Sequence, residues 1–278
     1  MSNILVKMST HYKPMSNCSF PFIPCVQDNA EIALSRSNHV PLSARYTISS
    51  ILGTTSSIQI PDLKPSYNLL VESLTTDEAI RKYANKNTSH DYSNVCALNF
   101  ANAIRCGGSY LDGLPGSQEE ELMRCIPSLY TTLNRVKYPF DNEKELLWTP
   151  PVQVQKIKTT LNTYNLEEKG PWTWIITAAA PDLRIPDISF NQTQHIKLLT
   201  AILVLPQLSP WSQDIDTLIL GAFGNGVFLN DPVITSTMFS RLLPMCVGTH
   251  IKRIVFAIPG GMENENFKTY QKYLTSSI

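Results

Sequence analysis

The segment VCALNFANAIRCGGSYLDGLPGSQEEE, residues 95–121, predicts a strand, a glycine-rich loop and a helix in direct succession. Val95–Phe100 is a short apolar run, which is typical of a buried strand. Ser117 stands three residues before Glu120, the spacing of a capping box, so we expect a helix over 117–135 with a bend at Pro127. Ligands of α/β sheets bind beyond the carboxyl ends of the strands, and the loop between these elements is therefore a candidate site.

On either side of this segment, short apolar strands alternate with helical stretches along the chain. This alternation predicts a single three-layer α/β/α domain on a mixed central sheet, over residues 46–278. Residues 1–45 are rich in Ser, Asn and Pro, and we expect an irregular amino-terminal extension there. Residues 138–171 are interpreted as a long, less regular insertion with a Lys-rich helical stretch. The expected strands are 67–72, 172–178, 217–222 and 253–258, and the expected helices are 76–85, 196–205, 233–243 and 265–274.

Composition excludes several classes of protein. Lys and Arg number 23 and so do Asp and Glu, which argues against a direct nucleic-acid binder because phosphate neutralisation needs a surplus of positive charge. No apolar stretch is long enough to span a membrane, and the amino terminus has no export signal, so we expect a soluble intracellular protein, in cytoplasm or nucleus. The cysteines show no metal-binding spacing, and we expect free thiols, no metal and no cofactor.

A second loop, LGAFGNGVFLNDP over residues 220–232, follows another predicted strand. Its glycines, Gly221, Gly224 and Gly226, allow the backbone to turn with positive φ and to direct successive N–H groups into one concavity, which can bind phosphate ahead of a helix. A tight strand-to-helix turn explains the same pattern equally well. Phe223 and Phe228 flank the concavity, where they either stack on a base or ribose or pack into the core.

Two readings of the glutamates at the start of the helix remain open from the residues alone. Acidic residues at a helix amino terminus commonly do no more than complement the helix dipole. However, a carboxyl group held against apolar and ligand surface has a raised pKa and can act as a general acid. Cleavage of a glycosidic bond needs such an acid to protonate the leaving oxygen.

These two loops resemble the signatures of the microbial poly(ADP-ribose) glycohydrolases, a family within the macrodomain superfamily. The first loop contains LNFANA and CGGS, followed after eight residues by QEE, and this order is similar to that family's GGG loop followed by QEE. The second loop, GAFGNGVFLNDP, is similar to the family's diphosphate loop GAWGCGVF-x-NDP. The resemblance runs from about Leu70 to the carboxyl terminus. It implies a macrodomain fold and an enzyme that cleaves ribose–ribose O-glycosidic bonds of poly(ADP-ribose).

The resemblance also implies a role for each matching residue. Glu120 would be the acid–base residue, Glu119 would hydrogen-bond the ribose hydroxyls, and Gln118 would support the pair. Asn102 would contact the distal ribose. The glycine loop would contact the ribose through Gly107, Gly108 and Ser109. The diphosphate loop would hold the pyrophosphate, and Phe228 would also pack on the adenosine-side ribose. The residues of this loop are Gly221, Ala222, Phe223, Gly224, Asn225, Gly226, Val227 and Phe228.

The chain departs from the family pattern at three of these positions. Ser109 replaces the third glycine, at a cost of about 1 kcal/mol or more if the backbone there needs positive φ. Phe223 and Asn225 replace the usual Trp and Cys. The alternatives left open are a mono-ADP-ribosyl-protein hydrolase, a non-catalytic ADP-ribose reader and an unrelated nucleotide-sugar enzyme on the same fold. The expected partner is ADP-ribose or poly(ADP-ribose), attached to a protein or not, bound by a monomer.

Overall fold

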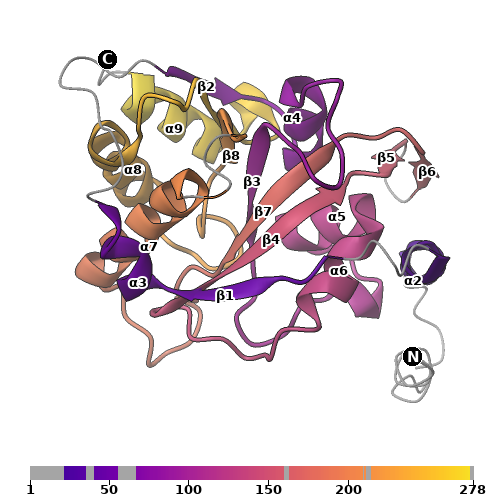
Figure 1. Ribbon diagram of the computed structural model, residues 1–278. Coiled ribbons are helices and arrows are strands. Elements are labelled where there is room, and N and C mark those ends of the chain that lie inside the picture. Colours follow the sequence, from indigo (N-terminus) through magenta and orange to yellow (C-terminus); the bar gives the residue numbers. More distant parts are fainter. Residues whose placement is uncertain are drawn as a thin grey trace.

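A seven-stranded sheet in the order β1-β4-β7-β3-β8-β9-β2 forms the centre of the molecule (Figure 1). The computed structural model describes residues 22–35, 41–55, 67–159, 163–208, 210 and 214–275. The strands from β7 to β2 are parallel to one another, whereas β4 is antiparallel to both its neighbours. The strands are β1 (Ala44–Thr47), β2 (Asn68–Glu72), β3 (Val95–Phe100), β4 (Glu145–Gln153), β7 (Trp172–Ala178), β8 (Thr217–Leu220) and β9 (Arg253–Ala257).

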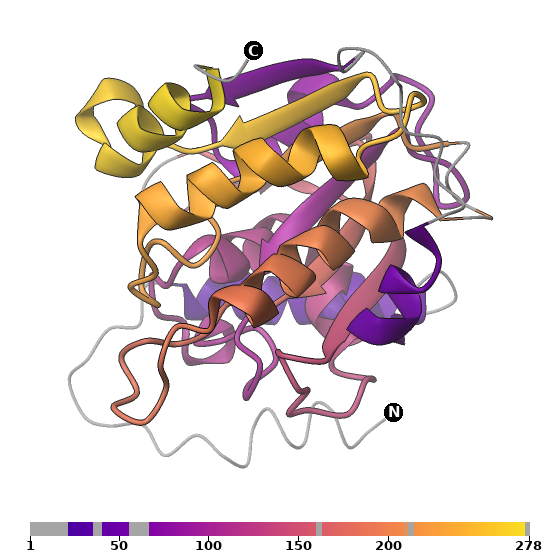
Figure 2. The ribbon, with the colours of Figure 1, turned by 90° about the vertical axis from the view of Figure 1, so that its left-hand side faces the viewer.

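Helices cover both faces of this sheet, which confirms the predicted three-layer α/β/α fold with a mixed sheet. The layer of α3, α7, α8 and α9 lies in front of the sheet in Figure 2, and α2, α4, α5 and α6 lie on the opposite face. The helices are α2 (Ile23–Ser35), α3 (Ile48–Leu52), α4 (Thr76–Tyr83), α5 (Gln118–Cys125), α6 (Pro127–Leu133), α7 (Gln192–Val204), α8 (Pro232–Cys246) and α9 (Glu265–Thr275).

Alternation along the central strand explains why the helices lie on both faces. In β3, Cys96 and Leu98 belong to the core cluster under α7 and α8, while Val95 and Ala97 belong to the cluster under α4 and α5. Successive side chains of a strand point to opposite faces, so a continuous apolar run requires cover on both sides. The predicted strands at 67–72, 95–100, 172–178, 217–222 and 253–258 are confirmed to within two residues.

The predicted helix over 117–135 is in fact two helices. It breaks at Ile126, where φ and ψ are −120° and 85°, and Pro127 begins α6. Proline lacks the N–H that a continuous helix needs and disfavours helical geometry in the residue before it, so it ends α5 rather than bending it.

The interpretation of residues 138–171 as a less regular insertion with a helical stretch is wrong. β4 is an integral strand of the sheet, and the small hairpin of β5 (Lys156–Lys158) and β6 (Tyr164–Leu166) follows it. The pairing of β4 with β7 shifts register between Thr149 and Val152, at the two prolines. Because proline cannot donate to a ladder, the strand accommodates both prolines in a bulge.

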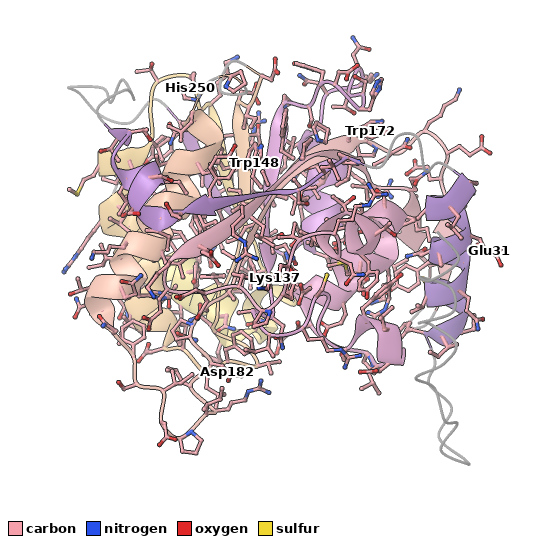
Figure 3. All side chains as sticks on the ribbon, turned by 60° about the horizontal axis from the view of Figure 1, so that its bottom comes forward. Glu31, Lys137, Trp148, Trp172, Asp182 and His250 are labelled. Carbon is pink, nitrogen blue, oxygen red and sulfur yellow. The ribbon has the colours of Figure 1, made fainter. Side chains whose placement is uncertain are left out.

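Residues 23–35 also differ from the expected irregular extension, because they form helix α2. Its Asn29 side chain is buried and donates to the carbonyl oxygen of Met123 at 2.8 Å, which ties α2 to α5. Glu31 on the same helix points away from the domain (Figure 3). Only three residues of this helix are buried, namely Val26, Asn29 and Ala33.

Two further findings concern cysteines and membrane-spanning potential. Five cysteines in the described part of the chain are free thiols: Cys25, Cys96, Cys106, Cys125 and Cys246. Cys18 lies outside the described residues. None of the described helices has both the length and the apolar character needed to cross a membrane.

Candidate active site

Both signature loops lie at the carboxyl edge of the parallel strands, side by side. The glycine-rich loop follows β3 and the predicted diphosphate loop follows β8, and β3 and β8 are paired neighbours in the sheet. Loops that follow adjacent parallel strands meet at the same edge, which is where α/β sheets bind ligands.

The glycine-rich loop has the backbone geometry that its sequence predicts, with one exception. Gly107 and Gly108 have φ values of 71° and 55°, the left-handed region in which glycine is favoured. Ser109, in contrast, has φ −92° and ψ 11°. The expected backbone cost of serine at the third position is therefore absent.

Glu120 is buried, and both of its carboxylate oxygens accept hydrogen bonds. Oε1 accepts from the N–H and the hydroxyl of Ser109, at 2.8 and 2.9 Å. Oε2 accepts from the N–H and the hydroxyl of Ser117, at 2.6 and 2.9 Å, so the predicted capping box forms. Burial by itself would raise the pKa of Glu120, but the hydrogen bonds outweigh it and the pKa is lowered from its ordinary value.

Glu119 has the opposite electrostatic character. Its side chain is 2% exposed, and it accepts hydrogen bonds from the N–H of Asn102 at 2.8 Å and from Nδ2 of Asn99 at 3.3 Å. Burial raises its pKa to about 8, the nearby charge of Glu120 contributes in the same direction, and the hydrogen bonds only partly oppose them. The raised pKa that we expected for an acid therefore belongs to Glu119 and not to Glu120.

Glycines enclose the two carboxyl groups. A Cβ atom on Gly108 would lie 2.4 Å from Oε1 of Glu120 and 3.4 Å from Oε2 of Glu119, and one on Gly116 would lie 2.4 Å from Cδ of Glu120. The backbone of this loop consequently approaches the Glu120 carboxyl group at a distance that no other residue type permits. Neighbouring carboxyl groups in a shielded position are suited to share one proton between them.

Gln118 and Asn102 hold this arrangement in place. Gln118 donates to the carbonyl oxygen of Leu98 at 2.7 Å and accepts from the N–H of Phe100 at 2.9 Å, which joins α5 to the end of β3. These bonds hold the start of α5 against the sheet, and the predicted support of the glutamate pair by Gln118 stays a prediction. The side-chain oxygen of Asn102 accepts from the N–H of Ile104 at 2.8 Å, so it stabilises the turn that leads into the glycines.

The loop after β8 uses its glycines differently from the expectation. Of its three glycines only Gly224 has positive φ, at 77°, and Leu229 has φ 58°. Gly221 is required for packing instead, since a Cβ there would lie 2.8 Å from the carbonyl oxygen of Ala257. The N–H groups of Gly226, Val227 and Phe228 have no acceptor among the described residues, which leaves them available to an anion.

The helix that follows this loop does not offer its own amino terminus to a ligand. Asp231 is the N-cap of α8, and its carboxylate accepts from the N–H of Val233 at 2.7 Å and of Ile234 at 3.2 Å. The expected contribution of the helix end to phosphate binding is therefore replaced by that of the loop backbone alone.

The three remaining side chains predicted in this loop have separate positions. Phe223 is fully buried and packs edge-to-face on Phe100, so core packing is the correct reading for it. Phe228 is half-buried and lines the cavity. Asn225 points into the protein, where it donates to the carbonyl oxygen of Asn230 and accepts from the hydroxyl of Tyr270 at 2.7 Å, and thereby anchors the loop to α9.

A cavity of about 360 Å³ extends along the two loops. Its walls include Ala222, Gly224, Gly226, Val227 and Phe228 from the diphosphate loop, together with Ser117 and Gln118 from the start of α5. The carboxyl groups of Glu119 and Glu120 are not part of the wall. Glu119 and Glu120 directly follow Ser117 and Gln118 in the chain, and these two residues do line the cavity.

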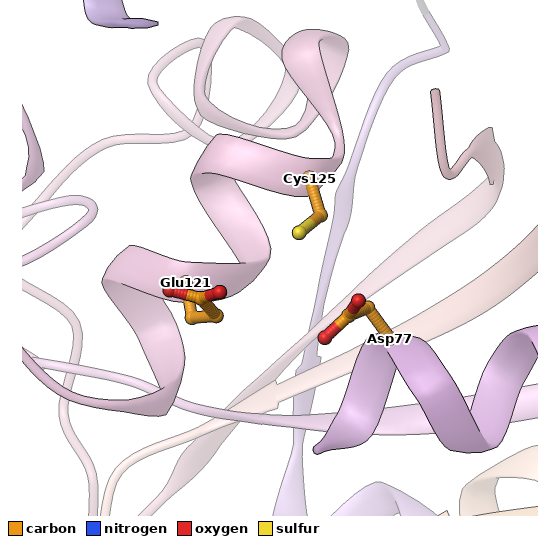
Figure 4. A group of neighbouring side chains, drawn as sticks. All are labelled: Asp77, Glu121 and Cys125. Carbon is orange, nitrogen blue, oxygen red and sulfur yellow. The ribbon is translucent and has the colours of Figure 1, made fainter. Parts of the chain in front are cut away.

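The sequence did not identify the polar end of this cavity. Asp77 of α4 faces Glu121 and Cys125 of α5, and one potential ligand atom of each lies within 4.8 Å of the others (Figure 4). Glu121 is paired with Lys158, whose Nζ lies 3.3 Å from Oε1. Burial raises the pKa of Asp77 and of the Cys125 thiol.

Thr75 and Asp77 were predicted only to cap a helix, and not to belong to a site. Thr75 is the N-cap of α4 and Asp77 lies in its first turn, so the prediction of a helix start at these residues is confirmed. Lys158 lies in a segment interpreted as an insertion, and Asn99 lies inside a strand, where its contact with Glu119 depends entirely on how α5 packs.

Comparisons with known proteins agree with this geometry. The family model of the microbial-type PARG catalytic domain matches residues 25–152, which confirms the resemblance seen in the glycine loop. The poly(ADP-ribose) glycohydrolase (PARG) from Thermomonospora curvata superposes with a TM-score of 0.71 and 21% identity, over 92% of this chain and 98% of that chain. PARG from Deinococcus radiodurans, in complex with ADP-ribose, gives 0.64 and 21%, over 85% and 95%. At this identity the solved structures establish the fold. No curated protein matches the chain.

Proposed function

Since the chain matches the microbial-type PARG catalytic domain over residues 25–152 and shares the fold of bacterial PARGs, we propose that it is a hydrolase that cleaves the ribose–ribose O-glycosidic bonds of poly(ADP-ribose). The observation that carries this proposal is the buried pair Glu119 and Glu120 beside Gly108, which directly follows Ser117 and Gln118, residues that line one cavity together with the loop after β8. A glycosidase acting on a diphosphate-containing polymer needs both of these features.

The ligand fits this site in one direction. Its diphosphate lies against the N–H groups of Gly226, Val227 and Phe228, which have no acceptor within the described chain. The distal ribose then extends past Asn102 to the carboxyl pair. The ADP-ribose complex of the relative from Deinococcus radiodurans supports ADP-ribose as the ligand class.

Glu120 performs the acid–base chemistry in this proposal. In the ligand-free protein its carboxylate is stabilised by Ser109 and Ser117. A bound ligand excludes water and brings the negative charge of its diphosphate closer, and both effects raise the pKa of a carboxyl group. Glu120 can then protonate the leaving oxygen and, as a carboxylate again, activate the water that attacks the anomeric carbon.

Glu119 holds the ribose. With a pKa of about 8 it is protonated at neutral pH, so it can donate a hydrogen bond to a ribose oxygen as well as accept one. Its oxygens are fixed by Asn99 and Asn102, which sets the position of the ribose relative to Glu120.

The experiment that tests the proposal is hydrolysis of poly(ADP-ribose) by the wild type and by Glu120→Gln. We expect turnover to fall by about 10²- to 10⁴-fold, the usual contribution of a general acid–base group. Glu31→Gln, on the exposed face of α2, is the matched control and keeps wild-type turnover. The amide nitrogen of the glutamine would face donors, so thermal unfolding and calorimetry with ADP-ribose are measured on the same variant to show that the site remains folded.

Two outcomes would contradict the proposal. Near-normal turnover in Glu120→Gln would exclude Glu120 as the acid–base residue. Absence of ADP-ribose binding by the wild type would exclude the ligand class altogether. Parallel incubation with protein carrying a single ADP-ribose identifies the released product and distinguishes poly(ADP-ribose) hydrolysis from mono-ADP-ribosyl-protein hydrolysis.

A further inference from the structure

Ser109 supplies a hydrogen bond to Glu120 that a glycine cannot supply. Its hydroxyl donates to Oε1 at 2.9 Å, beside its own backbone N–H at 2.8 Å. The signature that this loop resembles has a third glycine here, and a glycine would retain the N–H but not the hydroxyl. One of the donors to Glu120 is thus a feature of this chain.

The backbone accommodates the serine without strain. Ser109 has φ −92°, an ordinary value for any residue, whereas the close approach to the carboxyl groups is made one residue earlier by Gly108. The side chain of Ser109 is therefore placed beside Glu120 by a relaxed backbone. On the other carboxylate oxygen, Ser117 repeats the same pair of donors, N–H and hydroxyl.

We propose that Ser109 is a positioning residue that, together with Ser117, clamps the Glu120 carboxylate between two serine hydroxyls and sets the pH range in which the site works. This inference rests on the proposed function insofar as it concerns activity. It concerns a residue that holds Glu120 and does not itself react.

Hydrogen bonds to the charged form of a carboxyl group stabilise that form and lower its pKa. The charged or titratable groups that act on Glu120 besides the serines are Glu119 on the same helix and Arg105 of the loop. Arg105 is held in a salt bridge with Asp112 at 2.6 Å, which does not involve the Ser109 side chain. Loss of the Ser109 hydroxyl should consequently raise the pKa of Glu120.

The test is a carboxyl ¹³C NMR titration of full-length protein labelled at glutamate, with Glu120→Gln used to assign the Glu120 signal. We expect the pKa of Glu120 to rise by about one unit in Ser109→Ala and in Ser109→Gly, the change that a single charge-assisted hydrogen bond accounts for. Ser117→Ala should shift it in the same direction. Ser35→Ala is the control, because that hydroxyl bonds within α2 at Ile32 and is remote from the site.

The pH profile of kcat/KM on poly(ADP-ribose) is measured in parallel. Because Glu120 must be protonated to act as the acid, the alkaline limb of this profile should move to higher pH by the same amount in both Ser109 variants. An unchanged Glu120 titration in Ser109→Ala and Ser109→Gly would overturn the proposal. A shifted titration in a protein that does not hydrolyse poly(ADP-ribose) would leave Ser109 as the positioning residue and would overturn the proposed function instead.

Discussion

Replacing Gly108 by alanine probes how tightly the catalytic loop encloses Glu120. The new Cβ would lie 2.4 Å from Oε1 of Glu120, so the carboxylate must move. That oxygen accepts both hydrogen bonds from Ser109, and hydrogen bonds to charged groups contribute about 1.5–3 kcal/mol each. The left-handed backbone conformation costs alanine about 1 kcal/mol more. Together these terms predict that the free energy of unfolding falls by about 4 kcal/mol or more.

Gly261→Ala is the matched control. Gly261 has φ 53°, close to the 55° of Gly108, but its Cβ would meet only Oγ of Ser73, at 3.2 Å. It therefore incurs the backbone cost of about 1 kcal/mol without disturbing a carboxylate. For a domain of this size, we expect the melting temperature to fall by roughly 10 °C in Gly108→Ala and by roughly 3 °C in Gly261→Ala.

Differential scanning calorimetry measures both melting temperatures, and hydrolysis of poly(ADP-ribose) is assayed on the same samples. Gly108→Ala should lose turnover by about 10²-fold or more, because Glu120 is displaced, whereas Gly261→Ala should keep wild-type turnover. Equal melting temperatures in the two variants would refute the reasoning, since they would show that Glu120 does not pack against Gly108.

Two further predictions concern pH. The pKa of Glu119 is raised to about 8 from an ordinary value near 4.5, so the folded protein binds this proton more tightly than the unfolded chain does. The free energy of unfolding should therefore fall as pH rises from 4.5 to 8. Glu119→Gln should abolish that loss in urea unfolding measured across this range, and a pH dependence equal to that of the wild type would contradict the prediction. His195 is buried without a hydrogen-bond partner among the described residues, and burial lowers its pKa to about 4 from 6.5. The unfolded chain then binds the extra proton, so about 3 kcal/mol is lost as pH falls from 6.5 to 4, and His195→Leu should show a shallower loss in the same measurement.

The local elements around the site could be predicted from the sequence because their signals are local. A capping box requires only Ser117 and Glu120 at the right spacing, and it formed. Positive φ at Gly107 and Gly108 follows from two adjacent glycines after a strand. Apolar runs as short and continuous as Val95–Phe100 need cover on both faces, and that requirement alone predicts the three layers.

Elements that depend on contacts with distant parts of the chain were predicted incorrectly from the sequence. β4 contains two prolines, which argue against a strand, yet it lies within the sheet because a bulge opposite β7 absorbs them. Helix α2 is held by a few buried contacts with distant residues, such as the hydrogen bond from Asn29 to Met123. Pro127 was recognised, but whether it bends or ends a helix depends on what packs around it.

The sequence by itself determined which residues are candidates for the chemistry: a carboxyl pair at a helix start, a glycine-rich loop before it and a second loop after a strand. Only the tertiary structure decided how the two glutamates differ. Glu119 is enclosed by β3 and has its pKa raised, while Glu120 is surrounded by the donors of Ser109 and Ser117 and has its pKa lowered. The physical reason is that a pKa depends on burial and on the donors within hydrogen-bond distance, and these are set by how distant segments pack and not by the order of residues along the chain.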